Sequence, residues 1–387
     1  MNRLLALARL LAINLGVMVI LLLLLAEGGL RLAGIARPAY YRYDPIRGFS
    51  HRPGAQGRWT QEGSGWVSIN RAGFRDGDHS AKPITGVLRV AVLGDSFSEA
   101  FQVNQNQTWW QQLQNQVNGT RPCPLTAAYP KGIELLNFGV GAYGTGQELL
   151  TWQTNGRQSQ PQLVLLAMFL GNDIDDNTPR ARDDRPVFRL DPSGKLQLDN
   201  SFRQSPASRF RQSWPGRSLN WLVEHSRLVQ LLNAAKNRAA NPAVPQLGPD
   251  KSKKGLPPGP PPAAPASPSG WALTAALIKR LNQEVQAAGA QLIVISLTSP
   301  EQLWPNRRQR PAKPFAKEQQ LEAVLQPLGI TYFPLAPTLQ QQADAQGLSL
   351  HGFPGQQPGL GHWNANGHRL AAVALARRLC AKPLGGR

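Results

Sequence analysis

Five short apolar runs recur along the chain between residues 87 and 335, separated by longer and more polar segments. The runs are nearly continuous in Val, Leu and Ile and do not alternate with polar residues, which is typical of strands buried on both faces of a parallel sheet. We therefore expect about five parallel strands. Their sequences are VLRVAVL (87–93), IELLNF (133–138), LVLLAMF (163–169), LIVISL (292–297) and ITYFPL (330–335).

Segments with helical periodicity lie between these runs. The longest is 271–289, and the last, 367–380, places Leu370, Val373 and Ala374 on one helix face. Shorter helical segments are predicted at 108–117 and 147–153. Strands that alternate with helices predict an α/β fold. We expect a doubly wound, flavodoxin-like, three-layer α/β/α sandwich.

The N-terminus carries an apolar run from Leu10 to Ala26, preceded by Arg3 and Arg9 and ended by Glu27. This length is within the range of a membrane-spanning helix. A cleaved signal peptide is the alternative, but the leucines at 21–25 lead into Ala-Glu-Gly-Gly without a clear cleavage site. We therefore predict that residues 1–34 are an uncleaved membrane anchor.

The arginines before the apolar run predict the orientation of the chain. By the positive-inside rule they stay in the cytoplasm, and everything after about residue 30 lies on the extracytoplasmic, periplasmic side. Cys123 and Cys380, the two cysteines, both fall in that exported part. An isolated pair in an oxidising compartment is a candidate disulfide, and the first and last helices of a doubly wound sheet flank the same face.

The chain is strongly basic, with 42 Lys and Arg against 23 Asp and Glu, a formal net charge of +19. Such a charge favours contact with polyanions. No zinc-ligand spacing, aromatic RNA-binding pattern or basic region with heptads is present, so nucleic acid is not the expected partner. Anionic lipid and acidic polysaccharide remain as candidates.

Composition divides the exported part into four further segments. Residues 35–86, rich in Gly, Pro and Tyr, are expected to be a membrane-proximal stem, and 87–178 and 271–387 to be two parts of one domain. Residues 179–270 are too long for a connection within a compact domain and predict an insertion. Its basic, aromatic part (201–238) either lies over the site, faces anionic lipid or glycan, or forms a solvated helix. Residues 255–268 (GLPPGPPPAAPASP) predict a flexible linker.

Candidate chemistry follows the ends of the predicted strands. Ligands bind at the carboxyl ends of the strands in an open α/β sheet. A Ser, a small-residue loop, an Asn and a His at this edge are the groups that acyl transfer needs, although Gly-Asp-Ser alone is also a common turn and helix cap. They are Gly94-Asp95-Ser96 after the first strand, residues 137–144 after the second, Leu170-Gly171-Asn172-Asp173 after the third, and His362 before the last helix.

These four blocks resemble, in order, those of the SGNH (GDSL-type) hydrolase family, over residues 87–178 and 271–380. The resemblance implies that Ser96 is the nucleophile and His362 the base. It also implies an oxyanion hole formed by the N–H of Ser96, by Ala142 with Gly141 before it, and by the amide of Asn172. Asp95 and Asp173 are expected to support the site.

The sequence departs from the family pattern at one position. The family usually has an Asp three residues before the base, and here that residue is Gly359. Another group or a backbone carbonyl then orients His362, or the site is impaired. A carbonyl acceptor predicts that Gly359→Asp leaves activity unchanged or raises it, provided that Gly359 does not need a positive φ.

The function expected is a serine esterase that hydrolyses acyl esters on envelope glycan, lipid or small molecules, without a cofactor. An O-acyltransferase that receives acyl groups from a membrane donor protein shares the motifs and stays open. So does a non-catalytic glycan- or lipid-binding module. The acidic run DIDDN (173–177) does not fit a calcium loop, because Thr178 stands where that loop requires Gly, so no metal is expected.

Overall fold

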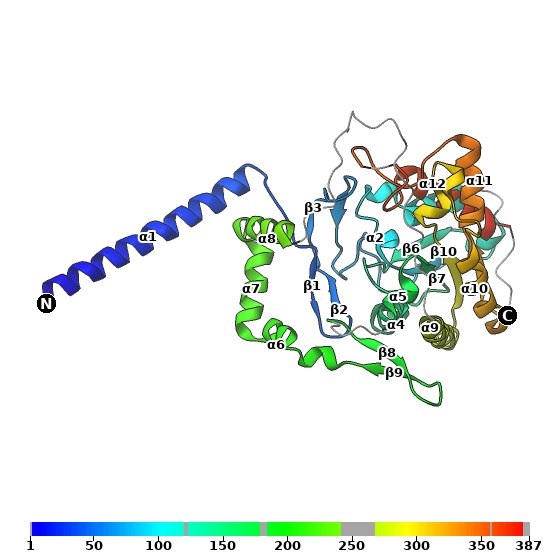
Figure 1. The fold of residues 1–387 in the computed structure, drawn as a ribbon, viewed down its shortest axis with the longest axis horizontal. Coiled ribbons are helices and arrows are strands. Elements are labelled where there is room, and N and C mark those ends of the chain that lie inside the picture. The colour runs from blue at the N-terminus through cyan, green and yellow to red at the C-terminus, as the bar shows by residue number, and fades with distance from the viewer. Residues whose placement is uncertain (1, 120–122, 179–183, 241–267, 357, 382–387) are drawn as a thin grey trace.

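The computed structural model describes residues 2–119, 123–178, 184–240, 268–356 and 358–381. A five-stranded sheet lies at its centre, with helices on both faces (Figure 1). Its strands, in spatial order, are β11 (Thr331–Pro334), β10 (Gln291–Ser296), β7 (Leu163–Met168), β5 (Leu88–Gly94) and β6 (Ile133–Asn137).

All four strand pairings are parallel, which confirms the predicted doubly wound α/β fold. In sequence order, β5 is the first strand of this sheet, β6 lies on one side of it, and β7, β10 and β11 follow on the other side. This is the flavodoxin-like order, and the direction of winding reverses between β5 and β7. Ligands bind at such a reversal, so the segments after β5 and β7 are the expected place for a site.

The helices form two layers over the sheet. Val90 and Val92 of β5 point into one core, while Ala91 and Leu93 point into the other, because successive side chains of a strand face opposite sides. This two-sided burial explains the continuous apolar runs. The first layer contains α3 (Trp109–Gly119), α11 (Ala336–Gln346) and α12 (Ala365–Leu379), and the second contains α4 (Thr145–Thr151), α9 (Pro268–Ala287) and α10 (Ala316–Leu325).

The predicted stem is folded and packs on the sheet domain. It forms two antiparallel pairs, β1 (Tyr41–Asp44) with β2 (Gly48–His51) and β3 (Gln56–Arg58) with β4 (Trp66–Ser68). A small core of Tyr40, Val67 and Ile69 packs on Phe101, which follows the first strand of the sheet domain. The stem is therefore an integral part of the body and not a spacer.

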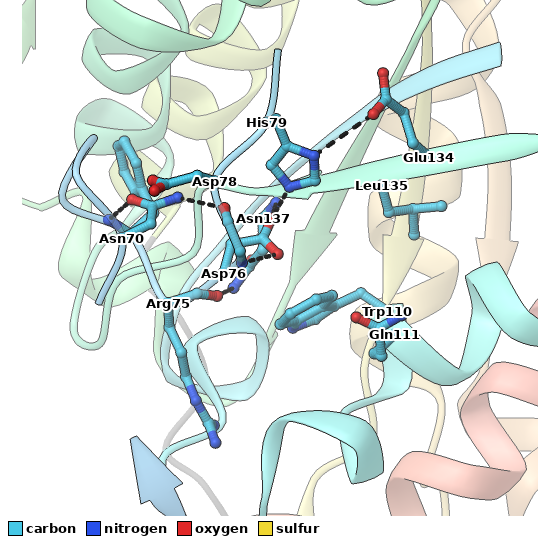
Figure 2. Close-up of polar contacts among 12 residues, drawn as sticks. Asn70, Arg75, Asp76, Asp78, His79, Trp110, Gln111, Glu134, Leu135 and Asn137 are labelled. Atoms are coloured by element: carbon cyan, nitrogen blue, oxygen red, sulfur yellow. Dashed lines mark hydrogen bonds and ion pairs between the residues drawn. The ribbon is translucent and has the colours of Figure 1, made fainter. Parts of the chain in front are cut away.

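Buried polar contacts fasten the end of the stem to β6 (Figure 2). The carboxylate of Asp76 accepts the backbone N–H of Asn137 at 2.8 Å and lies 3.0 Å from His79 Nε2. His79 Nδ1 also lies 3.5 Å from Glu134 on β6. Burial opposes a charged imidazole, but the two carboxylates outweigh it and raise the pKa of His79. The pairing holds residues 70–79 against the sheet.

The predicted insertion begins with a hairpin, β8 (Val187–Leu190) and β9 (Leu196–Asp199). Three helices follow, α6 (Pro206–Gln212), α7 (Trp214–His225) and α8 (Arg227–Ala240). Helix α8 packs beside the C-terminal end of the N-terminal helix α1 (Asn2–Leu32), and α7 and α6 lead from there toward the hairpin (Figure 1). Residues 255–267 of the predicted linker lie outside the described residues. In α1, Leu5–Leu32 is a candidate membrane span by length and composition, and its most apolar stretch is not buried within the protein.

The predicted disulfide between Cys123 and Cys380 is present, with the two Cα atoms 4.6 Å apart. Helices α3 and α12 pack against each other on the same face of the sheet. Cys123 follows α3 and Cys380 ends α12, as the doubly wound arrangement requires. The bond joins the first and last helices of the sheet domain.

We expect the paired substitution Cys123→Ser and Cys380→Ser to lower the free energy of unfolding by about 2–5 kcal/mol, because the bond closes a long loop in the unfolded chain. Urea unfolding of the detergent-solubilised protein measures this change. The wild type treated with a reductant should unfold at the same urea concentration as the double variant. Equal stability of variant and oxidised wild type would contradict the expectation.

Candidate active site

Ser96 begins the short helix α2 (Ser96–Glu99), directly after β5. The buried carboxylate of Asp95 caps this helix and accepts the N–H of Phe97 at 3.0 Å. Asp95 therefore has the local structural role of a helix cap. The side chain of Ser96 is left at the carboxyl edge of the sheet, where β5 and β7 separate.

His362 lies beside Ser96, although 266 residues separate them in the sequence. The distance from His362 Nε2 to Ser96 Oγ is 2.8 Å, within range for a hydrogen bond. The imidazole also packs on the ring of Phe97, with ring centroids 5.0 Å apart. The residues predicted as nucleophile and base are thus brought together.

The other imidazole nitrogen faces a carboxylate that the sequence analysis did not identify. His362 Nδ1 lies 2.5 Å from Oε2 of Glu62, and the backbone N–H of His362 donates to Oε1 of Glu62 at 2.7 Å. Glu62 belongs to the loop between β3 and β4 of the stem. The stem therefore supplies the group that orients the imidazole. Ser96, His362 and Glu62 form a continuous chain of hydrogen bonds, called the row below.

The turn before His362 is shaped to admit that carboxylate. Gly361 has a φ of +77°, and a Cβ atom there would collide with Oε1 of Glu62. Gly359, at the usual Asp position of the family, has a φ of +88°, and a Cβ atom would lie 2.7 Å from Pro305. Gly359 therefore has the positive φ that the sequence analysis set as an exception, and the expectation that Gly359→Asp preserves or raises activity does not apply.

The mutual contact of His362 and Glu62 shifts the pKa values of both groups. Burial alone would lower the pKa of His362, but the hydrogen bond and charge of Glu62 outweigh it and raise that pKa above its usual value. Burial would raise the pKa of Glu62, but its bonds from His362 lower it. Glu62 is therefore ionised when the imidazole takes up a proton, as a base in acyl transfer requires.

Three buried carboxyl groups near the row have raised pKa values, in contrast to the lowered pKa of Glu62. Burial raises the pKa of Asp95 to about 6, and burial also raises the pKa of both Glu148 and Asp173. Asp173 accepts the N–H of Phe169 at 2.8 Å and so holds the segment after β7. Among the described residues, no group of three or more His, Cys, Asp or Glu is arranged to hold a metal ion.

The predicted oxyanion donors line one cavity with Ser96. Asn172 donates one amide N–H to Asp176 at 2.8 Å, and its second amide N–H is left for another acceptor. Ala142 has a φ of +60°, and its N–H, like that of Ser96, donates to no acceptor within the described part of the chain. Both backbone donors are therefore free for a substrate.

Gly141 has a different role from the predicted one. Its N–H donates to Glu99 Oε1 at 2.8 Å and so is not free to bind an oxyanion. The same oxygen accepts Tyr41 OH at 2.6 Å and lies 2.6 Å from His51 Nε2. Burial and the neighbouring carboxylate raise the pKa of Tyr41 well above its usual value. Glu99 thus fixes the loop before Ala142, using two side chains of the stem.

The cavity around this site has a volume of about 1660 Å³. Its walls come from the stem, from the strand ends of the sheet and from helices α6–α8 of the insertion. Cavities for small molecules usually measure about 300–1,000 Å³, so this one has room for a larger substrate. Four arginines line it: Arg42, Arg52, Arg211 and Arg217.

No family model matches this chain, and no curated protein matches it. Solved structures with related folds include an acetylxylan esterase from Geobacillus stearothermophilus, which is 9% identical with a TM-score of 0.39 and aligns over 77% of this chain and 97% of its own. A lipolytic protein of the G-D-S-L family from Desulfitobacterium hafniense is 12% identical, with a TM-score of 0.35 over 75% and 98%. These likenesses are too distant to assign an activity to this chain.

We expect Glu62→Gln to reduce kcat for a soluble aryl ester by up to about 10⁴-fold, the loss seen when a triad carboxylate is neutralised. The acid limb of the pH profile should also move to lower pH. His362 must be neutral to accept a proton, and without the Glu62 charge burial lowers the His362 pKa. Glu322→Gln, an exposed change on α10, is the control. An unchanged rate and pH profile in Glu62→Gln would rule out this role.

We expect Gly359→Asp to lose stability and activity together, because the new side chain meets Pro305 and requires an unfavourable φ. Thermal unfolding and ester hydrolysis, measured on the same preparation, test this. A stable variant with raised activity would show that the turn accepts a side chain.

Proposed function

We propose that this protein is a serine esterase of the SGNH type that hydrolyses acyl esters. Ser96 Oγ attacks the ester carbonyl while His362 Nε2 removes its proton. His362 then donates that proton to the leaving alcohol, and the acyl group remains on Ser96. Water, deprotonated by His362, releases the acyl group as a carboxylic acid and restores Ser96.

The row from Ser96 through His362 to Glu62 is the observation that carries this proposal. A neutral imidazole needs Nδ1–H held by an acceptor so that Nε2 faces the nucleophile. Glu62, ionised and 2.5 Å from Nδ1, supplies both that orientation and a charge that stabilises the imidazolium. A binding module without catalysis needs no such row, so the complete arrangement favours an enzyme.

The oxyanion of the tetrahedral intermediate is assigned to three donors: the N–H groups of Ser96 and Ala142 and the amide of Asn172. Each donor of this kind typically contributes about 10²–10³-fold to the rate. Gly141 contributes indirectly. Its N–H bond to Glu99 holds the loop that positions the N–H of Ala142.

The cavity points to an acyl ester carried on a large, polar partner. Its volume exceeds that of common small-molecule sites, and its lining is polar, with charged side chains of both signs. We therefore propose O-acyl groups of an envelope glycan or of a lipid head group as the substrate class. Helix α1 would anchor the enzyme, with the catalytic domain on the extracytoplasmic side.

The size of the cavity also favours a second candidate, an O-acyltransferase that passes the acyl group from Ser96 to a sugar hydroxyl. The two activities share every step up to the acyl-enzyme. They differ in the acceptor, so a labelled acyl group would appear either as free acid or on the glycan. Mass spectrometry of both fractions separates them.

We expect Ser96→Ala to abolish labelling by a fluorophosphonate probe and to reduce ester hydrolysis to the background rate. The fold should be kept, because Ser96 lies at a strand end outside the apolar cores. Ser299→Ala, which removes another hydroxyl from the same cavity, is the matched control and should still be labelled. Hydrolysis that persists in Ser96→Ala would refute the proposal.

A further inference from the structure

Helices α6–α8 (residues 206–236, called the arm below) expose large apolar side chains. The surface of a soluble protein rarely carries many exposed large apolar side chains in one place. The exposed fractions are 74% for Trp214, 57% for Trp221, 42% for Leu222, 38% for Leu231 and 61% for Leu232.

The exposed residues of α7 named above lie on one side of that helix. Trp214, Trp221 and Leu222 follow an i, i+7, i+8 spacing and share one face of α7. The opposite face of α7 lines the cavity through Gly216, Leu219, Asn220 and Val223, at an i, i+3, i+4, i+7 spacing. One face of α7 therefore lines the cavity, while the apolar face is largely exposed, with the ring of Trp221 stacked on His225 of the same helix.

The arm is fastened to α1 at the point where the apolar run of α1 ends. The carboxylate of Glu27 accepts the backbone N–H groups of Arg227 and Leu228, each at 3.0 Å. It also accepts Ser226 Oγ at 2.9 Å, and Arg31 donates to the carbonyl of His225 at 2.5 Å. Glu27 thus caps the N-terminus of α8.

This cap fixes the position of the arm relative to the apolar segment of α1. Residues 5–26 of α1 are apolar apart from Arg9 and Asn14, and at 1.5 Å per residue they span about 33 Å, close to the ~30 Å hydrocarbon core of a bilayer. Glu27 is the first residue beyond that length. If α1 spans the membrane as proposed above, α8 begins at the boundary between hydrocarbon and head groups.

The charge of the arm suits the same location. The arm carries five basic side chains and a single acidic one, Glu224. Anionic lipid attracts basic residues near the surface, and Trp is favoured at the membrane interface. The basic residues are Arg209, Arg211, Arg217, Arg227 and Lys236, of which Arg211 and Arg217 line the cavity.

We infer that the arm is a membrane-binding surface that lies in the head-group region of the bilayer, with Trp214, Trp221, Leu222, Leu231 and Leu232 inserted toward the acyl chains. In Figure 1 the arm stands between α1 and the body of the protein. The cavity behind α7 is consequently held next to the lipid surface, where one of its walls is also the membrane contact.

Site-directed spin labelling of the full-length chain tests this placement. Both native cysteines are in the disulfide, so a new cysteine is the single reactive thiol among the described residues. The protein is reconstituted into vesicles of phosphatidylcholine and phosphatidylglycerol. The label is placed by Leu222→Cys or Leu232→Cys in the arm and by Leu15→Cys in α1. Leu198→Cys on β9 is the matched control, since Leu198 is 41% exposed and belongs to the same insertion, in a strand that lies farther from α1 than the arm does (Figure 1).

We expect labels at 222 and 232 to be several-fold less accessible to a water-soluble nickel chelate than the label at 198, and more accessible to oxygen. A label at 222 as accessible to the chelate as that at 198, with position 15 shielded, would overturn the inference while leaving the anchor in place; the apolar face would then be left for a protein partner. A water-accessible label at position 15 would overturn both. None of these outcomes depends on the esterase activity.

Discussion

The contact between Glu62 and His362 is the constraint around which this site is built. An imidazole can act as a base toward Ser96 only when its far nitrogen is held and its charged form is stabilised. The carboxylate does both, with one oxygen on the ring and the other on the backbone N–H of the same residue. Because Glu62 belongs to the stem, the base is correctly placed only when the stem is docked.

Several buried contacts keep the stem docked, and each of them reaches the catalytic segments. Arg75 donates to the carbonyls of Glu99 and Ala100 at the end of α2. Asn137 donates to the carbonyls of both Arg75 and Ser98 at 3.0 Å, joining the stem to the helix of the nucleophile. Stem, nucleophile and oxyanion loop therefore form one network, in which buried polar groups are costly to leave unpaired.

The same network joins the site to the N-terminal helix. Helix α1 leads directly into the stem, and its Glu27 caps α8 of the insertion. Stem and insertion both contribute walls to the cavity. In this arrangement the two segments nearest the proposed anchor also supply Glu62 and part of the wall of the cavity beside Ser96.

Local sequence determined the sheet domain, because buried strands, helix faces and strand-end motifs are patterns of neighbouring residues. The five apolar runs, the positions of Ser96, Asn172 and His362, and the pairing of Cys123 with Cys380 all follow from such patterns combined with one topology. Helices α10 and α11 were not anticipated, since few apolar residues mark their buried faces. The role of Glu62 could not be predicted from the sequence. Glu62 is one of four acidic residues in a stem that has no helical or strand periodicity, and 300 residues separate it from His362. Only the tertiary structure decides such a contact, since it depends on how the stem packs across the strand ends. The backbone angles at Gly359 and the use of the Gly141 N–H by Glu99 depend on the same packing.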